Sequence, residues 1–497
     1  MHIHILGICG TFMGGLAALA RAQGHRVTGC DTGVYPPMSE QLRELGIDLV
    51  EGYGVDQLAF QPDQYVVGNV VSRARLADGS ARYPLMEAIL DAGVPYTSGP
   101  QWLSDHVLPG RHVLAVAGTH GKTTTTSMLA WILECAGLAP GFLVGGVPLN
   151  FGASARLGLC TGTAGRAGAA APDGTGRPCF VIEADEYDTA FFDKRSKFVH
   201  YRPRTVVLNN LEFDHADIFD DLAAIERQFH HLLRTVPGSG PHGAGRVIVN
   251  GLEESLARVL HAGCWSEVRS FGAATSDYGA LGEPHQFQVT RAGVSVGEVR
   301  WSLGGVHNQL NALAAIAAAE HVGVGPAQAA RALADFRGVR RRMEVVARIA
   351  LPGATGHDRA VTLYDDFAHH PTAMRTTLEG LRRRVGPRAR ILALFEPRTN
   401  TMKLGGMKAQ LPASLEMADI SFCHSAGLGW DAVEVLAPMG ERARVVSSVD
   451  ALVQQVATLT APGDHIVCMS NGGFGGIHQK LVTALLARGG QQVADAA

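Results

Sequence analysis

The sequence predicts an α/β protein of three domains, in which mostly parallel sheets are covered by helices. Short apolar runs typical of buried strands alternate with helical stretches, and these runs end at glycine-rich or polar turns. The chain has 497 residues, and domains commonly hold roughly 150. Hydrophobic residues make up 46 %, which allows a large core and excludes a disordered or collagen-like chain.

The first predicted domain covers residues 1–108 and begins as a β–α–β arrangement. Its predicted elements are a strand at 3–6, a helix at 16–22, a strand at 25–29 and a strand at 65–69. A Leu-Pro-Gly sequence at 108–110 breaks the chain there, because proline and glycine interrupt regular structure. We therefore place the first boundary near residue 108.

The second and third predicted domains cover residues 109–335 and 336–497. The second has predicted strands at 112–117, 179–182 and 205–208, a Gly/Ala-rich flexible surface insertion at 155–178, and an Ala-rich helix at 308–322. The third has predicted strands at 360–364, 391–395 and 465–469. Each strand of the third domain ends in a polar or glycine-rich turn, and ligands of α/β sheets bind at such strand ends.

Charge and cysteine content narrow the class of protein. The net charge of −3 argues against a dedicated nucleic-acid binder, and we interpret the arginine runs at 340–342 and 382–384 as solvated helix faces. The eight cysteines have no close spacing and indicate reduced thiols. No apolar run reaches the ~18 residues of a membrane helix, and no basic residue precedes the first apolar stretch as in a signal peptide. We expect a soluble cytoplasmic protein.

A glycine loop at 118–125 is the strongest chemical signal. A predicted strand leads into Gly-Thr-His-Gly-Lys-Thr and then into a helix, so backbone N–H groups and the helix N-terminus favour a phosphate. Lys122 can neutralise β- and γ-phosphate charge, and the Thr123 hydroxyl can hold Mg²⁺. The first glycine of a standard Walker A loop would fall at Val116, so the match is incomplete. The alternative is a simple strand–turn–helix corner.

Further polar clusters occur at predicted strand ends and at one helix start. They lie at 183–188, 209–217, 307–312, 364–371 and 470–476. Carboxylates of the first cluster suit Mg²⁺, and Asn308 with Asn311 would share one helix face that could read a purine or ribose. Zinc is a poor candidate, since no cysteine or second well-spaced histidine completes a site. Each cluster alone could instead be a solvated turn or a helix cap.

The N-terminal loop departs from the dinucleotide fingerprint. That fingerprint requires glycines at positions 7, 9 and 12, whereas the chain has Gly7, Cys9 and Phe12. The loop therefore suits a phosphate but not specifically NAD. Asp31 could still meet a ribose hydroxyl, so an NAD-dependent oxidoreductase remains an alternative of another class, and a non-enzymatic ATP-binding switch is a third.

Taken together, the motifs resemble the Mur ligase family. The matching stretches, in family order, are 118–125, 183–188, 209–217, 307–311, 336–344 and 364–372. Residues 4–15, 34–39, 395–403 and 469–478 are similar to the branch that joins UDP-N-acetylmuramate to the tripeptide L-Ala-γ-D-Glu-meso-diaminopimelate in cell-wall peptide recycling. The branch that adds L-alanine in de novo peptidoglycan synthesis is the alternative.

The resemblance implies a Rossmann-like domain that binds UDP-N-acetylmuramate, a central P-loop ATPase-like domain, and a Rossmann-like C-terminal domain that binds the peptide and closes on ATP. It implies ATP-dependent amide synthesis through an acyl phosphate, giving ADP and phosphate. The implied cofactors are ATP and two Mg²⁺ ions, which Mn²⁺ can replace. The implied partners are these substrates, with no nucleic acid and no membrane, and the chain is expected to be a monomer or weak homodimer. Residues 227–231 contain no lysine, so we expect no carbamylated lysine of the kind some members carry.

The resemblance also assigns residues to roles. The implied catalytic residues are Lys122, Glu183 and His215. The implied metal ligands are Thr123, Glu183 and His215. The implied ATP-binding residues are Gly118, Thr119, His120, Gly121, Lys122, Thr123, Thr124, Asn308, Asn311, Arg341 and Asp365. The implied UDP-sugar-binding residues are Gly7, Cys9, Gly10, Thr11, Phe12, Met13 and Asp31. Acceptor binding is placed at His369, Arg398, Asn400 and Asn471.

Overall fold

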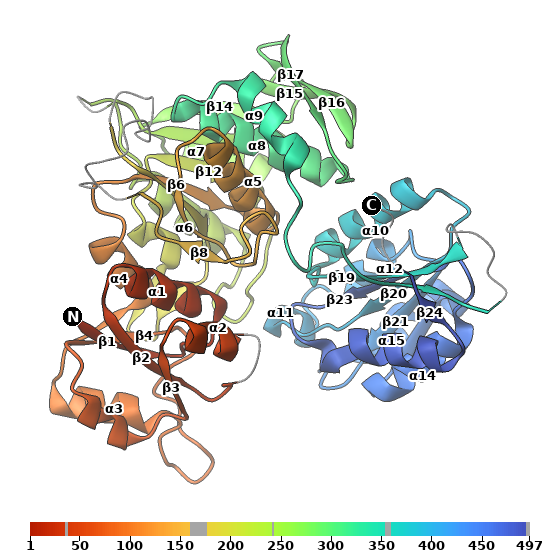
Figure 1. Cartoon of the computed structure of the whole chain (residues 1–497), viewed down its shortest axis with the longest axis horizontal. Coiled ribbons are helices and arrows are strands. Elements are labelled where there is room, and N and C mark those ends of the chain that lie inside the picture. The colour runs from red at the N-terminus through yellow and green to blue at the C-terminus, as the bar shows by residue number, and fades with distance from the viewer. Residues whose placement is uncertain (35–37, 160–175, 241–242, 353–358, 494–497) are drawn as a thin grey trace. The chain divides into compact units, whose positions relative to one another are not determined.

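The computed structural model describes residues 1–34, 38–159, 176–240, 243–352 and 359–493 (Figure 1). The chain forms two compact units. The first comprises Met1–Phe213, Asp221–Trp301 and Leu310–Gly338, and the second comprises Asp214–Asp220, Ser302–Gln309 and Val339–Ala497. Each unit is described by itself.

The N-terminal part of the first unit is a parallel sheet of five strands in the order β3-β2-β1-β4-β5. The strands are β1 (His2–Leu6), β2 (Arg26–Asp31), β3 (Asp48–Glu51), β4 (Gln64–Val67) and β5 (Tyr96–Ser98). The helices are α1 (Thr11–Ala22), α2 (Met38–Glu44), α3 (Pro84–Ala92) and α4 (Gly99–His106). Strand β1 lies in the middle of this sheet. The short loop that follows its end leads into the N-terminus of α1.

Helix α1 begins at Thr11, so the expectation of a helix starting at residue 16 is wrong. Glycine is a poor helix former, yet Gly14 and Gly15 lie inside this helix. A Cβ on Gly14 would lie 2.6 Å from Met38 Sδ, and one on Gly15 would lie 2.4 Å from Leu143 Cδ1. Close packing therefore requires glycine at both positions and outweighs its low helix propensity.

The central part of the first unit is a ten-stranded sheet in the order β17-β16-β15-β14-β13-β12-β6-β9-β7-β8. The strands from β7 to β15 in this order pair in parallel, while β8, β16 and β17 are antiparallel to their neighbours. Its strands are β6 (His112–Ala117), β7 (Gly141–Leu143), β8 (Ala155–Arg156), β9 (Cys179–Ala184), β12 (Thr205–Leu208), β13 (Arg246–Asn250), β14 (Glu267–Phe271), β15 (Tyr278–Glu283), β16 (Gln286–Arg291) and β17 (Val294–Arg300).

The accompanying helices are α5 (Lys122–Cys135), α6 (Leu222–Leu233), α7 (Glu254–His261), α8 (Val306–His321) and α9 (Pro326–Ala332), and β10 (Asp188–Ala190) with β11 (Asp193–Ser196) forms a separate hairpin. Strand β6 is buried along its whole length, as expected for a strand covered on both faces. The antiparallel hairpins of β15 to β17 form a part of the sheet that the predicted elements did not include.

The expectation of a flexible insertion at 155–178 is wrong for residues 155–159. Ala155 and Arg156 form β8 and pair with β7, and Arg156 forms an ion pair with Glu134 at 2.5 Å. The buried Arg111 donates to the carbonyls of Leu157 and Leu159, both at 2.9 Å. Residues 155–159 are therefore anchored, while 160–175 lie outside the described residues, as does part of the family-like stretch 34–39.

The second unit contains a seven-stranded sheet in the order β22-β21-β20-β23-β19-β18-β24, in which β18 and β24 are antiparallel to their neighbours. The strands are β18 (Glu344–Ala350), β19 (Val361–Asp366), β20 (Ile391–Phe395), β21 (Ile420–His424), β22 (Ala443–Val446), β23 (His465–Met469) and β24 (Gln491–Gln492). The helices are α10 (Pro371–Val385), α11 (Asn400–Lys403), α12 (Leu411–Ser414), α13 (Ala432–Leu436), α14 (Val449–Leu459) and α15 (Ile477–Ala487).

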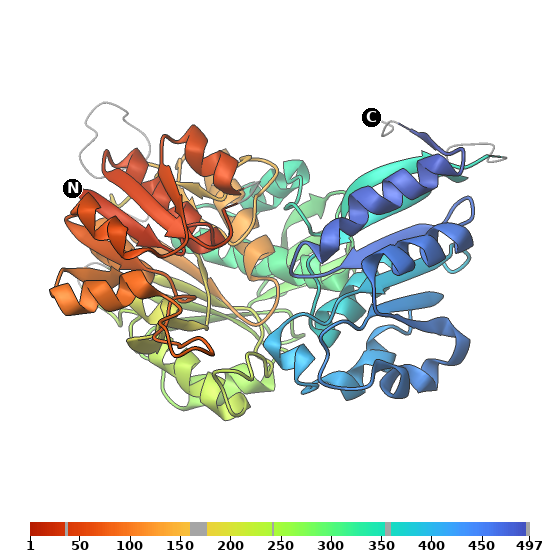
Figure 2. The same ribbon diagram turned by 90° about the horizontal axis from the view of Figure 1, so that it is seen from below.

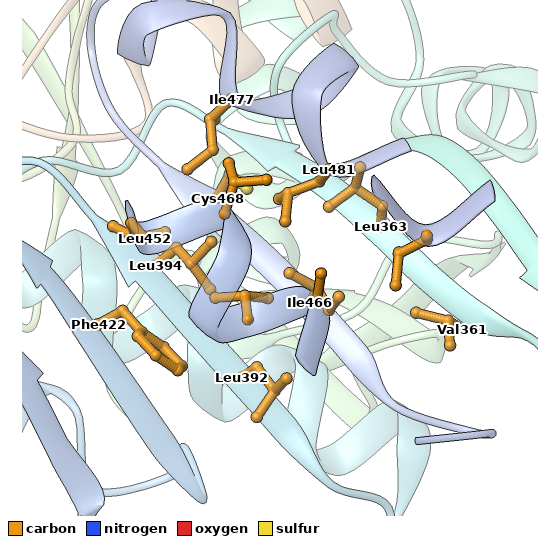
Figure 3. Packing of buried hydrophobic residues seen from close by; sticks show 14 of the residues in the cluster. Val361, Leu363, Leu392, Leu394, Phe422, Leu452, Ile466, Cys468, Ile477 and Leu481 are labelled. Carbon is orange, nitrogen blue, oxygen red and sulfur yellow. The ribbon is translucent and has the colours of Figure 1, made fainter. Parts of the chain in front are cut away.

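Helices α14 and α15 run side by side and cover one face of this sheet (Figure 2). The core beneath them joins Leu392, Leu394 and Ile466 of the sheet to Leu452 of α14 and Leu481 of α15 (Figure 3). These side chains are fully buried, and each contributes on the order of 1.5–3 kcal/mol of burial free energy. This packing fixes the strand ends that carry the polar loops of the second unit.

The predicted α/β class with mainly parallel sheets is confirmed. Among the described residues, no helix is long and apolar enough to cross a membrane. Among the described residues, Cys9, Cys30, Cys135, Cys264, Cys423 and Cys468 are not in disulfide bonds.

Candidate functional site

The loop between β6 and α5 has a backbone conformation that favours glycine at positions 118 and 121. Gly118 has φ +144° and Gly121 has φ +77°, a region that favours glycine. A Cβ on Gly121 would lie 2.6 Å from Asn311 Oδ1. The loop therefore presents its backbone at the N-terminus of α5, the arrangement that favours a phosphate group.

Two asparagines after β12 hold this loop in place. Asn210 accepts a hydrogen bond from the His120 backbone N–H through Oδ1 at 2.7 Å, and its carbonyl accepts from the Thr119 N–H at 3.2 Å. Asn209 Nδ2 donates to Thr125 Oγ1 at 3.1 Å and to Asn311 Oδ1 at 2.9 Å. The sequence placed both asparagines in a polar cluster but did not predict that they hold this loop.

Lys122 is largely buried, with 13 % of its side chain exposed, and it is ion-paired. Its Nζ donates to Glu186 Oε2 at 2.8 Å and to the Gly118 carbonyl at 2.5 Å. Burial disfavours its charged form, but the carboxylates of Glu186, Asp185 and Glu183 outweigh that effect and raise the pKa of Lys122. Lys122 therefore carries a positive charge in the glycine loop. Glu186, only 1 % exposed, is not the solvated turn residue that the sequence left possible.

Thr123 and Glu183 lie together beside the loop. The Thr123 hydroxyl donates to Glu183 Oε1 at 3.0 Å, and the Gly145 backbone N–H donates to Glu183 Oε2 at 2.6 Å. Glu183 lies within β9 and pairs in register with Val116, so the expectation that it follows the strand is wrong by two residues. A hydroxyl and a carboxylate side by side are hard oxygen donors of the type that Mg²⁺ prefers.

The remaining predicted nucleotide residues lie in different parts of the chain. Asn308 and Asn311 both lie on α8, as predicted, and Asn308 Nδ2 donates to the Gly304 carbonyl at 2.8 Å. Thr124 follows Thr123 in the first turn of α5. Arg341 and Asp365 belong to the second unit, where Arg341 Nε donates to Asp365 Oδ2 at 3.1 Å.

The N-terminal loop is held by Asp31 at the end of β2. The Cys9 backbone N–H donates to Asp31 Oδ2 at 3.0 Å, and the Thr32 N–H donates to Oδ1 at 2.8 Å. Burial, with Asp31 nearby, raises the pKa of the Cys9 thiol to about 11, so this cysteine is neutral at physiological pH. The Asp31 carboxylate thus holds the loop by accepting hydrogen bonds from backbone N–H groups. Its contact with a sugar stays a prediction.

The other predicted UDP-sugar residues are at the start of α1. Gly7 has φ +80° and donates its N–H to the Cys30 carbonyl at 2.8 Å. Gly10 is the N-cap of α1, and no side chain of this residue caps the helix. The first backbone amides of α1, at Thr11 and Phe12, therefore lie at a helix N-terminus, where N–H groups have no partner within the helix. Met13 is only 6 % exposed, and its side chain packs beside Gly68 and Gly99.

His215 belongs to a short segment of the second unit. Its φ is +56°, and its N–H donates to Asp214 Oδ1 at 2.7 Å. Thr401 Oγ1 donates to the same oxygen at 3.1 Å, and Asn400 Nδ2 donates to Asp217 Oδ2 at 3.1 Å. Burial raises the pKa of Asp214, but His215 and its N–H together with two further histidines lower it overall. Hydrogen bonds therefore join the segment that carries the predicted metal ligand His215 to the segment that carries the predicted acceptor residue Asn400.

Two of the other predicted acceptor residues, Arg398 and Asn471, lie at the loop after β23. A Cβ on Gly472 would lie 2.1 Å from Arg398 Nη1, so Arg398 lies directly against this loop. Asn471 is in the loop itself, and the His369 ring faces the Phe367 carbonyl at 3.0 Å. Within the second unit, Arg398 and Asn471 are brought together, and His369 follows the neighbouring strand β19.

Profiles of three domains match the chain in succession. They are described as "Mur ligase family, catalytic domain" (residues 2–110), "Mur ligase middle domain" (116–319) and "Mur ligase, glutamate ligase domain" (341–472). The chain belongs to the Mur ligase family. This assignment sets aside the oxidoreductase alternative, and it agrees with the resemblance inferred from the motifs.

Within the Mur ligase family, the chain is similar to ligases whose names state their substrates and to a solved murein peptide ligase structure. It is 52 % identical to the UDP-N-acetylmuramate–L-alanyl-γ-D-glutamyl-meso-2,6-diaminoheptandioate ligase of Escherichia coli (strain K12), with 98 % of each chain covered. A murein peptide ligase structure from Psychrobacter arcticus 273-4 is 46 % identical, with TM-score 0.72 and 98 % of both chains covered. A UDP-N-acetylmuramate–L-alanine ligase of Roseiflexus castenholzii is 34 % identical, with 80 % of this chain and 78 % of the relative covered.

Proposed function

We propose that this Mur ligase joins UDP-N-acetylmuramate to the tripeptide L-Ala-γ-D-Glu-meso-diaminopimelate, in recycling of cell-wall peptides. The single observation that carries the proposal is the 52 % identity, over nearly the full length of both chains, to a ligase with these substrates in its name. The relative named for L-alanine is less similar, at 34 % over a shorter stretch. The free substrates are a nucleotide sugar and a peptide, and we propose a monomer or weak homodimer.

The three predicted domains would divide the work. Residues 1–108 would bind UDP-N-acetylmuramate at the loop before α1, residues 109–335 would bind ATP at the loop before α5, and residues 336–497 would bind the peptide. The glycine loop and the largely buried Lys122 support the second assignment, because they supply backbone amides and a cation for a polyphosphate.

The proposed chemistry activates a carboxylate and then forms an amide. The lactyl carboxylate attacks the γ-phosphorus of ATP, the bond to the β-phosphate oxygen breaks, and ADP leaves. The neutral amine of the tripeptide's L-alanine then attacks the acyl carbon. The C–O bond breaks, phosphate leaves with the electron pair, and the nitrogen loses a proton. Lys122 would hold the phosphates in line, and such positioning and charge neutralisation supply most of phosphoryl-transfer catalysis.

ATP and Mg²⁺ fit the residues that the chain provides. Thr123 and Glu183 offer adjacent oxygen donors, and we propose that they hold Mg²⁺, with His215 contributing to a second ion. When bound, Mg²⁺ neutralises charge on the phosphates. Mn²⁺, which accepts the same oxygen and imidazole ligands, can take its place.

The test is a ligation assay with purified protein, ATP, Mg²⁺ and UDP-N-acetylmuramate. Free L-alanine and the tripeptide are supplied in parallel, and product mass and released phosphate are followed. We expect the tripeptide product and no L-alanine product. Preferential joining of L-alanine would move the chain to the de novo branch. ATP turnover that does not depend on UDP-N-acetylmuramate would instead favour the ATP-binding switch.

A further inference from the structure

A segment of the first unit, residues 185–201, starts beside the glycine loop and returns to it. Near its start lies Glu186, which accepts a hydrogen bond from Lys122 of that loop. The hairpin of β10 and β11 follows. Lys197 then comes back to the start of the segment, because its backbone N–H donates to the Tyr187 carbonyl at 3.0 Å.

The same segment also contacts the N-terminal part of the first unit. Its 3₁₀ helix η2 (Lys197–His200) ends at His200, whose Nδ1 lies 2.9 Å from Gln101 Oε1 of α4. Helix α4 starts at Gly99, where a Cβ would lie 3.0 Å from Phe12 Cε1 at the start of α1. This segment therefore connects the glycine loop to the loop that we propose for the UDP-sugar.

Lys197 places a second, largely buried cation in this segment. Its side chain is 10 % exposed, and its Nζ donates to Asp185 Oδ2 at 2.8 Å. Its Nζ also lies 5.5 Å from the centre of the Tyr187 ring, whose face attracts a cation. An ammonium has three N–H donors, and within the described residues Lys197 Nζ uses one of them. Two donors therefore remain for an anionic ligand.

The hydroxyl of Tyr201 is a buried donor in the same place. Tyr201 directly follows η2 and is only 1 % exposed, and its OH has no hydrogen-bond partner among the residues that the structure describes. Burial, with the carboxylates of Asp185 and Glu183 nearby, raises the pKa of Tyr201, so the hydroxyl keeps its proton. A buried hydroxyl without a partner is costly, and a ligand that accepts its proton removes that cost.

We infer that Lys197 and Tyr201 bind the lactyl carboxylate of UDP-N-acetylmuramate. This inference rests on the proposed function, in which that carboxylate must reach from the UDP-sugar loop to the γ-phosphate at the glycine loop. A carboxylate accepts hydrogen bonds from an ammonium and a hydroxyl, and such charge-assisted bonds are strong. Lys197 and Tyr201 hold one oxygen, and the other stays free to attack the γ-phosphorus. The pair thereby selects a nucleotide sugar that carries a lactyl group.

The experiment compares UDP-N-acetylmuramate with UDP-N-acetylglucosamine, which has a hydroxyl in place of the lactyl ether. Titration calorimetry gives the Kd of each nucleotide sugar, and we expect the wild type to prefer UDP-N-acetylmuramate. Tyr201→Phe should weaken binding of UDP-N-acetylmuramate about tenfold, the effect of losing one hydrogen bond to a charged group. The Kd for UDP-N-acetylglucosamine should not change.

Two lysine variants complete the comparison. Lys197→Met should reduce the preference for UDP-N-acetylmuramate more than Tyr201→Phe does, because it removes the cation. Lys194→Met is the matched control, since Lys194 lies in the same segment and pairs with Asp188, but its side chain is 70 % exposed. Lys194→Met should keep the wild-type preference.

Urea unfolding separates ligand binding from a structural role of Tyr201. Removal of an unpaired buried hydroxyl should leave the free energy of unfolding of Tyr201→Phe equal to that of the wild type or higher. An unchanged Kd for UDP-N-acetylmuramate in Tyr201→Phe, or equal weakening for both sugars, would overturn the inference, as would a wild type without preference. If Lys197→Met does not fold because Asp185 loses its cation, Tyr201→Phe alone decides. A wild type that ligates no UDP-N-acetylmuramate refutes the proposed function instead.

Discussion

Gly121→Ala, compared with Gly137→Ala, tests whether the loop before α5 binds the nucleotide. The two glycines flank α5 and share a φ of +77°. Alanine at either position therefore carries the same backbone strain, about 1 kcal/mol. The surroundings differ, because a Cβ at Gly137 meets nothing within 4 Å, while a Cβ at Gly121 lies 2.6 Å from Asn311 Oδ1 and 2.7 Å from Asn209 Nδ2.

The two amides that the Gly121 Cβ meets cannot move away cheaply. Asn209 and Asn311 are 3 % and 5 % exposed and bond to each other, and Asn209 also bonds to Thr125. Loss of these two hydrogen bonds costs about 1 kcal/mol each. Gly121→Ala should thus lower the free energy of unfolding by about 3 kcal/mol, against about 1 kcal/mol for Gly137→Ala.

The loop of Gly121→Ala can instead relax into another conformation, and ATP must then restore the original one. The difference of about 2 kcal/mol would appear as an ATP Kd about 30-fold weaker than in Gly137→Ala. Urea unfolding followed by circular dichroism gives the stabilities, and titration calorimetry with ATP and Mg²⁺ gives the Kd. Equal ATP affinity in the two variants, with both folded, would show that the nucleotide does not use this loop.

Three further predictions concern ionisable groups of the first unit. Lys122→Ala should reduce ligation by several orders of magnitude with the fold kept, and steady-state turnover near the wild-type rate would contradict its role. Glu183→Ala should raise the Mg²⁺ concentration needed for half-maximal activity or abolish activity; an unchanged Mg²⁺ titration would place the metal elsewhere. Burial lowers the pKa of His4 to about 4, below its unfolded value, so His4 stabilises the fold fully above about pH 6.5 and less as pH falls toward 4. The free energy of unfolding should drop by up to about 2 kcal/mol from this group between pH 7 and pH 5, and His4→Gln should reduce that slope.

The sequence predicted the buried strands well because their signals are local. Strands β6, β12, β20 and β23 have the predicted bounds, since each is an apolar run, preceded by at most one polar residue within the strand, that ends at a polar residue or glycine. The start of α1 was missed because its cause is not local: Gly14 and Gly15 are explained by Met38 and Leu143, which are distant in the sequence.

The candidate site shows the same difference between local signals, which the sequence reveals, and contacts between distant residues, which it does not. The glycine loop, Lys122 and Thr123 follow one another in the sequence, so a motif was enough to find them. Glu186 was not singled out among its acidic neighbours, because its pairing with Lys122 depends on how β9 lies beside β6. The supporting role of Asn209 likewise depends on α8, which follows it by about a hundred residues and supplies Asn311. Motifs thus predicted the groups that we propose to bind ligands, whereas the groups that hold them in place could be found only from the fold.

The charges around Lys122 give a physical reason for the proposed cation requirement. Lys122 pairs with Glu186, and Lys197 pairs with Asp185 at 2.8 Å, while Glu183 lies close enough to raise the pKa of Lys122 as well. These five side chains carry one net negative charge before a nucleotide binds. A polyphosphate adds several more, in a place where burial strengthens repulsion. For Lys122 to turn from Glu186 toward a phosphate, positive charge must arrive with the nucleotide, because otherwise Glu186 would be left buried without its cation. A divalent cation beside Thr123 and Glu183 supplies that charge, so nucleotide and metal should bind this loop cooperatively.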